Sequence, residues 1–280
     1  MTDALLARIA DALARLEAAL DRLAPPPPPA ADPANGDSFV WNATGLRAVT
    51  PAAAPPLARF VGVDAQRDTL LENTRRHARG LPAHDVLLWG ARGMGKSSLV
   101  RAATAAVRGE GHDLALIQVG RDNIATLPAL FDALADVPRA TLIFADDLSF
   151  EADETQYKAL RSVLDGGIAA RPANVRLVVT SNRRHLVPRV HADADAVNPR
   201  DVLDDRLALA DRFGLSLGFH NCDQDAYLAM VAGYAAQHGL AADPRAALEW
   251  AAARGNRSGR VAWQFIEEIA GAAGRRLDDP

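Results

Sequence analysis

The residue types from Gly90 to Ser98 are those that bind a polyphosphate. The segment reads G-x-x-x-x-G-K-S and follows an apolar run at 86–89, which is typical of a buried strand. Its glycines let backbone N–H groups turn toward an anion, and the helix expected next directs its positive end to the same place. We expect Lys96 to lie along the β- and γ-phosphates of ATP or GTP and the Ser97 hydroxyl to reach Mg²⁺. The residues expected to contact the nucleotide here are Gly90, Arg92, Gly93, Met94, Gly95, Lys96, Ser97 and Ser98.

Two carboxylates end another apolar run. Residues 141–145 read T-L-I-F-A, and Asp146 and Asp147 follow them directly. An enzyme that cleaves a nucleoside triphosphate needs one acid for the Mg²⁺ shell and a second that orients or deprotonates the attacking water. We expect Asp146 to serve the metal and Asp147 the water. The alternative is a pair of solvated acids at the end of a strand.

Three further polar residues stand where a phosphate site would use them. Asn182 closes a fourth apolar run and could hydrogen-bond the nucleophilic water, although an Asn after a strand is more often a turn residue. Arg212 lies just before the last expected strand, and Arg260 opens the last expected helix. A guanidinium that reaches the γ-phosphate from a neighbouring subunit neutralises charge in the transition state. The alternative for either arginine is a surface ion pair.

Alternating strands and helices must position these residues. Short apolar runs separated by helical segments predict a parallel sheet covered by helices on both faces. After His220 only helical patterns follow. We expect an α/β domain over 59–219 with a five-stranded parallel sheet, and an all-α lid over 220–280. The expected strands are 86–89, 114–119, 141–145, 175–180 and 215–219, and the expected C-terminal helices are 223–237, 244–253 and 258–272.

An amphipathic helix is expected over 3–23, in an N-terminal segment 1–24. Its apolar residues follow the 3-4-3-4-3 spacing of a short coiled-coil seam, and a helix packed on its own domain is the alternative. Five prolines, 25–29, end it, and we interpret 25–58 as a Pro/Ala-rich linker whose one apolar cluster, 39–41, anchors on the body. The helix would then be a tethered docking or oligomerisation element. Its seam residues are Leu6, Ile9, Leu13, Leu16, Leu20 and Leu23.

Composition narrows the class of protein. The chain has 280 residues, a formal charge of −4 and a single cysteine, Cys222. A lone cysteine fits a reducing cytoplasm, and a negative chain has no bulk attraction for nucleic acid. We find no apolar run of membrane-spanning length and no signal-peptide pattern, so we expect a cytoplasmic protein.

In this order the motifs resemble an AAA+ ATPase over about residues 59–272. The resemblance implies Mg-ATP bound between the α/β domain and the lid, with Val61 and Gly62 near the adenine, and a homo-oligomer whose subunits share each site. It implies sensor 1 at Asn182. It also implies a trans-acting arginine finger at Arg212, with Arg206 as the alternative, and sensor 2 at Arg260, with Arg257 as the alternative. The stretches GARGMGKSS, DDLSFE, TSNRRHL, DRFGL and RSGR are closest to a bacterial AAA+ family catalogued as a domain of unknown function.

The expected function is slow ATP hydrolysis that remodels or positions a macromolecular partner, with the N-terminal helix as a possible adaptor. Slow turnover is expected because Asp147 stands where most AAA+ enzymes have a longer Glu. The alternative is an initiator- or helicase-loader-like ATP switch on nucleic acid. Its basic clusters would be 75–79 and 183–185, but no helix-turn-helix pattern follows the lid. Two other classes of protein are disfavoured. In a small-molecule kinase Asn182, Arg212 and the lid would have no role. A GTPase would need an N-K-x-D segment to recognise guanine, and this sequence has none.

Overall fold

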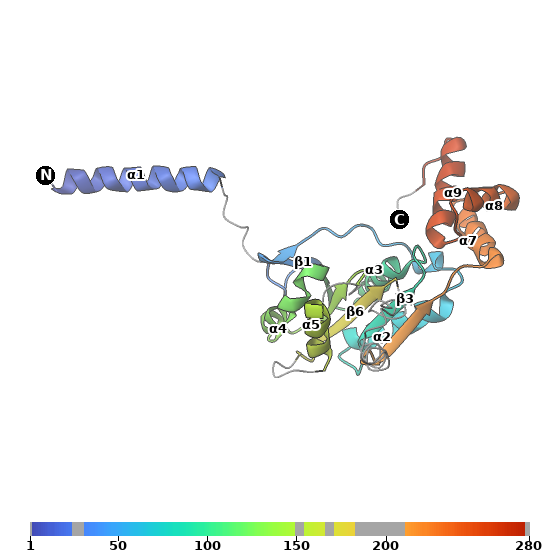
Figure 1. Ribbon diagram of the computed structural model, residues 1–280, viewed down its shortest axis with the longest axis horizontal. Coiled ribbons are helices and arrows are strands. Elements are labelled where there is room, and N and C mark those ends of the chain that lie inside the picture. Colours follow the sequence, from blue (N-terminus) through green and yellow to red (C-terminus); the bar gives the residue numbers. More distant parts are fainter. Residues whose placement is uncertain (1, 24–30, 149–153, 166–170, 183–210, 278–280) are drawn as a thin grey trace, which may run out of the picture. The chain divides into compact units, whose positions relative to one another are not determined.

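The computed structural model describes residues 2–23, 31–148, 154–165, 171–182 and 211–277 (Figure 1). The chain forms two compact units, Met1–Ala31 and Asp32–Pro280. The first contains one helix, α1 (Thr2–Leu23), close to the range predicted from the apolar spacing. No helix in the described part of the chain is both long and apolar enough to cross a bilayer.

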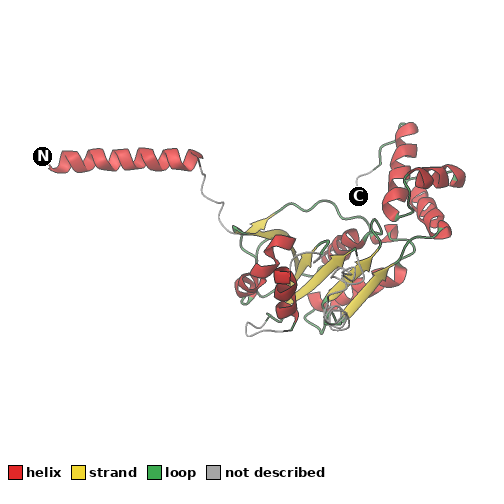
Figure 2. Ribbon diagram, in the orientation of Figure 1, coloured by secondary structure: helices red, strands yellow, loops and turns green. Residues whose placement is uncertain are grey.

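The second unit is built on a seven-stranded sheet in the order β2-β1-β4-β5-β6-β3-β7 (Figure 2). Every neighbouring pair is parallel except β1 and β2, which form an antiparallel hairpin. The predicted class, a P-loop parallel sheet flanked by helices, is confirmed. The strands are β1 (Ser38–Asn42), β2 (Gly45–Ala48), β3 (Val86–Gly90), β4 (Leu114–Val119), β5 (Ala140–Ala145), β6 (Val175–Ser181) and β7 (Leu215–Phe219).

The predicted number of strands, five, is wrong. The five expected strands are β3 to β7, and the hairpin β1–β2 is added from residues that we interpreted as linker. β1 pairs in parallel with β4, with Val40 opposite Gln118, and Phe39 is buried. The apolar cluster 39–41 does anchor on the body, but as a strand of the sheet. One short run among prolines and alanines gives no signal of its own, because the edge of β4 supplies its hydrogen bonds.

Helices cover both faces of the sheet. The connection from β3 through α3 to β4 crosses the sheet in the direction opposite to those through α4 and α5, so right-handed crossovers put α3 on one face and α4 and α5 on the other. Strand residues on both sides are buried: Leu88 shares a core with α3, while its neighbour Leu87 points to the opposite face. In the described part of this unit the helices are η1 (Leu57–Arg59), α2 (Asp64–Ala78), α3 (Lys96–Gly109), η2 (Arg121–Thr126), α4 (Leu127–Leu134), α5 (Glu154–Leu164), α7 (Gln224–Gln237), α8 (Pro244–Ala253) and α9 (Gly259–Ala272).

Each of the three C-terminal helices begins at a capping side chain. The side chains of Asp223, Asp243 and Ser258 accept hydrogen bonds from backbone N–H groups in the first turns of α7, α8 and α9. Each cap satisfies a donor that has no partner within its helix, and this fixes where the helix starts. The start of α9 matters most, because it lies against the loop after β3.

The order of the central strands brings three carboxyl ends together. β5, β6 and β3 are consecutive neighbours, with Ala145 opposite Val179 and Trp89 opposite Ser181. Residues that follow these strands therefore meet at one edge of the sheet, where ligands bind in open α/β folds. The loop after Gly90, the acids after Ala145 and Asn182 are those residues.

His77 on α2 is buried at 3% exposure, and its Nε2 lies 3.0 Å from the carbonyl oxygen of Thr141 on β5. Only a protonated Nε2 can donate to that carbonyl, which leaves Nδ1 as the nitrogen that would take up a second proton. Burial lowers the pKa of His77 from 6.5 to about 4. The folded protein therefore holds a neutral imidazole where the unfolded chain would bind a proton.

We predict that this imidazole lowers the free energy of unfolding of the second unit at acid pH. As the pH falls from 6.5 to 4, His77 becomes protonated in the unfolded state but stays neutral in the folded state. This difference lowers the free energy of unfolding by about 3 kcal/mol. His77→Gln keeps an N–H for the Thr141 carbonyl but does not titrate. Urea unfolding of both proteins at pH 7.5 and 4.5 should show a smaller loss for the variant. Equal losses would contradict a neutral, buried His77.

Candidate nucleotide-binding site

The loop between β3 and α3 is shaped by glycines in the left-handed region. Gly90, Gly93 and Gly95 have φ values of 124°, 76° and 85°, and Gly95 directly precedes the first turn of α3. At Gly90 the next strand leaves no room for a side chain, since a Cβ would lie 2.0 Å from the carbonyl oxygen of Phe219. That same oxygen accepts a hydrogen bond of 2.7 Å from the Ala91 N–H. The loop is therefore tied to the end of β7.

Lys96 at the start of α3 is buried, with all three of its donors in use. Its Nζ donates to the carbonyl oxygens of Gly90 and Ala91 at 2.8 and 2.9 Å, and to Oδ1 of Asn182 at 3.0 Å. Burial lowers the pKa of the Lys96 ammonium, and the nearby Asp147 and Asp146 oppose that shift. A phosphate that binds Lys96 must therefore replace one of these three acceptors.

The Asp146 carboxylate joins α3 to β6. Its Oδ1 accepts hydrogen bonds of 2.5 Å from the hydroxyls of both Ser97 and Thr180. The Thr180 oxygen also accepts from the backbone N–H of Asp147 at 2.8 Å, so one hydroxyl positions both acids. We assigned no role to Thr180 from sequence. The available signal was a hydroxyl at the carboxyl end of a strand, one residue before Ser181 and two before Asn182.

Asp147 stands in an unusual backbone conformation. Its φ is 51°, and among the described residues it is the one non-glycine with positive φ. Asp tolerates this region better than most residues, yet the conformation costs energy and persists only where neighbours hold it. Here Asn182 Nδ2 donates to Asp147 Oδ1, while the Asn182 oxygen accepts from Lys96. Asn182 thus bridges the second acid and the lysine.

These residues line one pocket of about 390 Å³. It opens between the loop after β3, the acids after β5 and the end of β6, and Arg260 of α9 also lines it. Apart from Thr180, the lining consists of charged and polar residues that we expected there, Arg260 among them, and of the loop glycines. The full lining is Arg92, Gly93, Gly95, Lys96, Ser97, Ser98, Asp146, Asp147, Thr180, Asn182 and Arg260.

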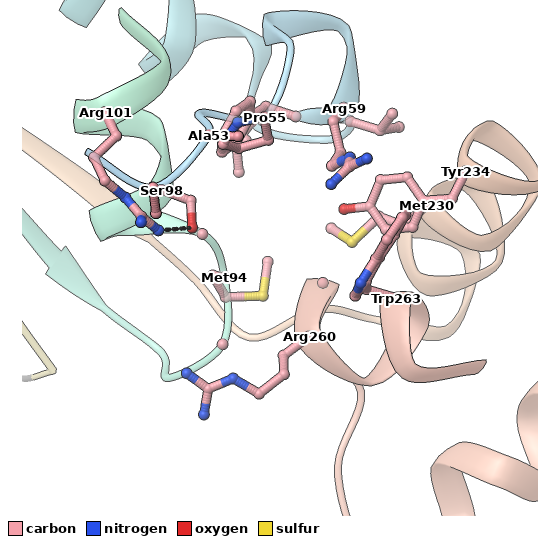
Figure 3. A pocket seen from close by; sticks show the side chains of 17 residues that line it. Ala53, Pro55, Arg59, Met94, Ser98, Arg101, Met230, Tyr234, Arg260 and Trp263 are labelled. Carbon is pink, nitrogen blue, oxygen red and sulfur yellow. Dashed lines mark hydrogen bonds between the residues drawn. The ribbon is translucent and has the colours of Figure 1, made fainter. Parts of the chain in front are cut away.

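A second, more apolar pocket of about 540 Å³ continues from the first (Figure 3). The two pockets share Gly93, Gly95, Ser98 and Arg260 in their linings. Figure 3 shows Arg59, Tyr234 and Trp263 facing one another across the far end of this cavity, with Met94 and Met230 nearer its centre. These side chains come from η1, the loop after β3, α7 and α9.

Arg59 and Trp263 make the most specific contact in the second pocket. The Arg59 guanidinium carbon lies 4.0 Å above the centre of the Trp263 ring, and the Tyr234 ring meets Trp263 edge-on at 5.9 Å. Arg59 Nε is buried and has no hydrogen-bond partner among the described residues. Burial lowers the pKa of the Arg59 guanidinium, and the nearby Tyr234 opposes that shift. A buried donor beside aromatic and thioether groups suits a flat ring with acceptor nitrogens.

Only some of the remaining residues that we expected near the nucleotide line either of these two pockets. Val61 lines the second pocket, whereas Gly62 lines neither, although a Cβ there would come within 3.7 Å of Met230. Arg260 lines both pockets, while its alternative Arg257 lines a different one, beside Cys222. Arg212 hydrogen-bonds Asp165 and lines neither pocket.

Arg206, the alternative to Arg212, lies outside the described residues, as does most of the stretch TSNRRHL. Sequence reasoning missed Arg59, Tyr234 and Trp263 altogether. Their positions are far apart along the chain, and no spacing rule connects η1 with α7 and α9 before the fold is known.

The start of α9 touches the loop after β3 directly. The Arg260 backbone N–H donates to the Gly93 carbonyl at 3.0 Å, and a Cβ on Gly93 would lie 2.9 Å from the Ser258 hydroxyl. α9 therefore starts against the loop, with its N-terminal end near the first pocket. Movement of α9 and a change in the loop cannot be independent.

Solved structures share this architecture at low sequence identity. The structure of Aeropyrum pernix ORC1 in complex with DNA has a TM-score of 0.52 at 17% identity, over 78% of this chain and 62% of that chain. A mutant of Thermotoga maritima RuvB has a TM-score of 0.50 at 18% identity, over 81% and 68%. The Thermotoga maritima RuvB Holliday junction branch migration motor has a TM-score of 0.49 at 19%, over 81% and 69%. No match was found among curated proteins.

The chain therefore shares its fold with these structures. It belongs to the family described as "Protein of unknown function (DUF815)", whose model matches residues 34–273. This confirms the resemblance drawn from the motifs, and the matched range also includes the β1–β2 hairpin that we had interpreted as linker.

We predict that Gly90→Ala destabilises the body strongly. The added methyl group cannot be accommodated beside the Phe219 carbonyl, and φ of 124° strains any residue except glycine. We expect a loss of about 2 kcal/mol or more in unfolding free energy. Gly109→Ala is the matched control, because it adds the same methyl group near the end of α3 with nothing within 4 Å. Equal urea midpoints for the two variants would contradict the close approach of β7.

Proposed function

We propose that this protein is an AAA+ ATPase that binds and slowly hydrolyses Mg-ATP at a site shared between subunits, and so remodels or positions a macromolecular partner. One observation carries the proposal. The lysine of the P-loop, the two acids and the strand-tip asparagine line a single polar pocket that continues into an apolar one. A nucleoside triphosphate likewise has a highly charged part, the phosphates, and a flat, less polar part, the base.

The phosphates would lie in the polar pocket and the base in the apolar one. Lys96 and the N–H groups at the start of α3 offer positive charge to the phosphates, and Arg260 can add its guanidinium from the lid. The base would lie among Val61, Met230 and Trp263, with the unpartnered Arg59 Nε as a donor to a ring nitrogen. Ribose would then bridge the residues that the two pockets share.

The donors beside the phosphate loop fit Mg²⁺. Ser97 and Asp146 present hard oxygen atoms already in contact at 2.5 Å, and Mg²⁺ is commonly held by one or two carboxylates together with substrate phosphates. When bound, Mg²⁺ neutralises charge on the β- and γ-phosphates. Thr180 keeps the Asp146 carboxylate oriented toward that position.

Hydrolysis would use the Asp147–Asn182 pair. A water oxygen bonds to the γ-phosphorus while the bond to the bridging β–γ oxygen breaks, and Asp147 orients the water or accepts its proton. Asn182 holds Asp147 now and can hydrogen-bond the water instead. Turnover should be slow, because the aspartate side chain is one methylene shorter than glutamate and its backbone is already in a constrained conformation.

A neighbouring subunit would complete the site. Arg212 lines neither pocket of its own chain, so a role at the γ-phosphate requires another copy. Head-to-tail contacts of this kind form a ring when the rotation from one subunit to the next closes. Arg212 is the proposed trans-acting residue, and Arg206 remains its alternative.

A protein partner is favoured over the alternative of a switch acting on nucleic acid. The basic cluster 75–79 is largely neutralised: Arg75 pairs with Glu110 and Glu72, Arg76 also pairs with Glu72, and His77 is buried. Paired arginines have little left to offer a phosphate backbone. The second cluster, 183–185, lies outside the described residues. DNA contact by similar folds belongs to those proteins and carries no weight at such low identity.

We predict that Lys96→Ala weakens ATP binding at least tenfold. The variant removes the charge expected to meet the β- and γ-phosphates, an effect of about 2–3 kcal/mol or more for a buried charge-assisted bond. Lys158→Ala is the matched control, because these are the only two lysines in the chain. Isothermal titration with Mg-ATP should show wild-type affinity for Lys158→Ala and at least a tenfold loss for Lys96→Ala. Equal affinities would exclude the first pocket as the phosphate site.

We also predict that two inactive variants restore activity when mixed. Lys96→Ala lacks the phosphate contact but keeps Arg212, and Arg212→Ala has the reverse defect. At equal amounts, random assembly completes about a quarter of the interfaces. Phosphate release should rise to about that fraction of the wild-type rate per subunit.

A control mixture keeps this test specific. Lys96→Ala with Asp147→Asn should stay inactive, because both defects lie on the same side of the proposed interface. Recovery in both mixtures, or in neither, would contradict the assignment of Arg212. The same pair of mixtures with Arg206→Ala tests the alternative residue.

A further inference from the structure

The apolar side chains of α1 are unusually exposed. Leu6, Ile9, Leu13 and Leu16 are 60%, 48%, 59% and 57% exposed, and in the described part of the chain Leu81 is the one other large apolar side chain so exposed. Exposure of a whole row of Leu and Ile is unfavourable in water and marks an interaction surface.

These residues form one stripe with a heptad repeat. Their spacing of three and four residues puts Leu6 and Leu13 at position a, and Ile9 and Leu16 at position d. The sequence continues the repeat to Leu23, which gives three a and three d positions within two and a half heptads. Most of the stability of such an amphipathic helix comes from packing of its apolar face, so an uncovered stripe leaves α1 without that contribution.

Charges are divided between the two sides of the stripe. Arg8 and Arg15 stand at position c, on the flank next to the d residues, and Arg22 continues that row in the sequence. Glu17 stands at position e, on the flank next to the a residues, and the sequence places Asp3 and Asp21 at positions e and b of the same flank. One flank is therefore basic and the other acidic.

We propose that α1 associates with α1 of other copies of this chain as a parallel coiled-coil bundle. In a parallel bundle the d-side flank of one helix faces the a-side flank of the next, so the basic flank of each helix faces the acidic flank of its neighbour. In an antiparallel pair like flanks meet, and arginine faces arginine. Small residues such as Ala10 and Ala12, at positions e and g, allow the helices to approach closely and leave the charge pairing to the longer side chains.

Association through α1 needs no nucleotide. It is therefore distinct from the proposed ATP-dependent contact between the second units, which we call the bodies. Only residues 24–31 separate α1 from the second unit. A bundle of α1 helices would hold several bodies at a high effective concentration, of the order of millimolar for a short connection. α1 would thus be an assembly element and not an adaptor for a foreign protein.

The molar mass of the purified full chain without nucleotide tests the proposal. Light scattering at about 50 μM should give a multiple of 29.8 kDa for wild type and a single-chain mass for Leu13→Asp, since a charge in the seam cannot be buried unpaired. Ala7→Asp adds the same group to α1 off the stripe and should keep the wild-type mass. A monomeric wild type, or a Leu13→Asp variant of unchanged mass, would overturn the proposal.

A disulfide trap tests the parallel orientation. In a Cys222→Ser background, Leu6→Cys should cross-link to itself, because equal a positions face each other in a parallel bundle. An antiparallel pair places Leu6 opposite Leu23, about 25 Å from the other Leu6. Cross-linking of Leu6→Cys only when it is mixed with Leu23→Cys would refute the parallel arrangement. Ala7→Cys, off the stripe, is the control for random oxidation.

Failure here can be told apart from failure of the ATPase proposal. Lys96→Ala should keep the wild-type mass without nucleotide, because it leaves α1 unchanged. In the Leu13→Asp background, any ATP-dependent gain in mass then reports contacts between the bodies alone. That gain should disappear when Lys96→Ala is added, whatever α1 does.

Discussion

The Asp146 carboxylate connects the parts of the candidate site. It follows β5, and one of its oxygens accepts from Ser97 at the start of α3 and from Thr180 on β6. Three elements from distant parts of the sequence are thereby fixed within hydrogen-bond distance of one another. The remaining polar contacts build on this junction: Thr180 also holds the Asp147 backbone, and Asn182 connects Asp147 to Lys96. Loss of the junction would separate the phosphate loop from the acids that it needs.

The polar side chains of the site already hydrogen-bond one another, so a ligand must displace some of these contacts to bind. Lys96 uses its three donors on its own chain, and both acids have partners. An incoming phosphate competes with these contacts, so its binding must rearrange them. Because Arg260 and Ser258 lie against Gly93, a rearranged loop also changes the contacts of α9. Coupling between a ligand at Lys96 and the position of α9 therefore needs no connection beyond these few atoms.

Sequence predicted the parts of the fold that carry a local signal. The strands β3 to β7 have apolar runs, Asp223, Asp243 and Ser258 have the right type and place for caps, and the P-loop has its own spacing. The hairpin β1–β2 escaped prediction because its stability comes from β4 and not from its own residues. Thr180, Arg59 and Trp263 escaped for a related reason. Each acquires its neighbours through tertiary packing, which leaves no pattern along the chain. The roles proposed for the site residues stay predictions.

The hairpin also changes which part of the sheet meets solvent. Without it β4 would be an edge strand of six residues with a free row of backbone donors and acceptors. β1 satisfies that row, and β2, only four residues long, becomes the edge instead. A short edge is a poor template for another sheet, so the hairpin protects the body against aggregation through strand pairing. A fragment cut at residue 59, where composition suggests the body begins, would lose that protection while keeping the whole candidate phosphate pocket.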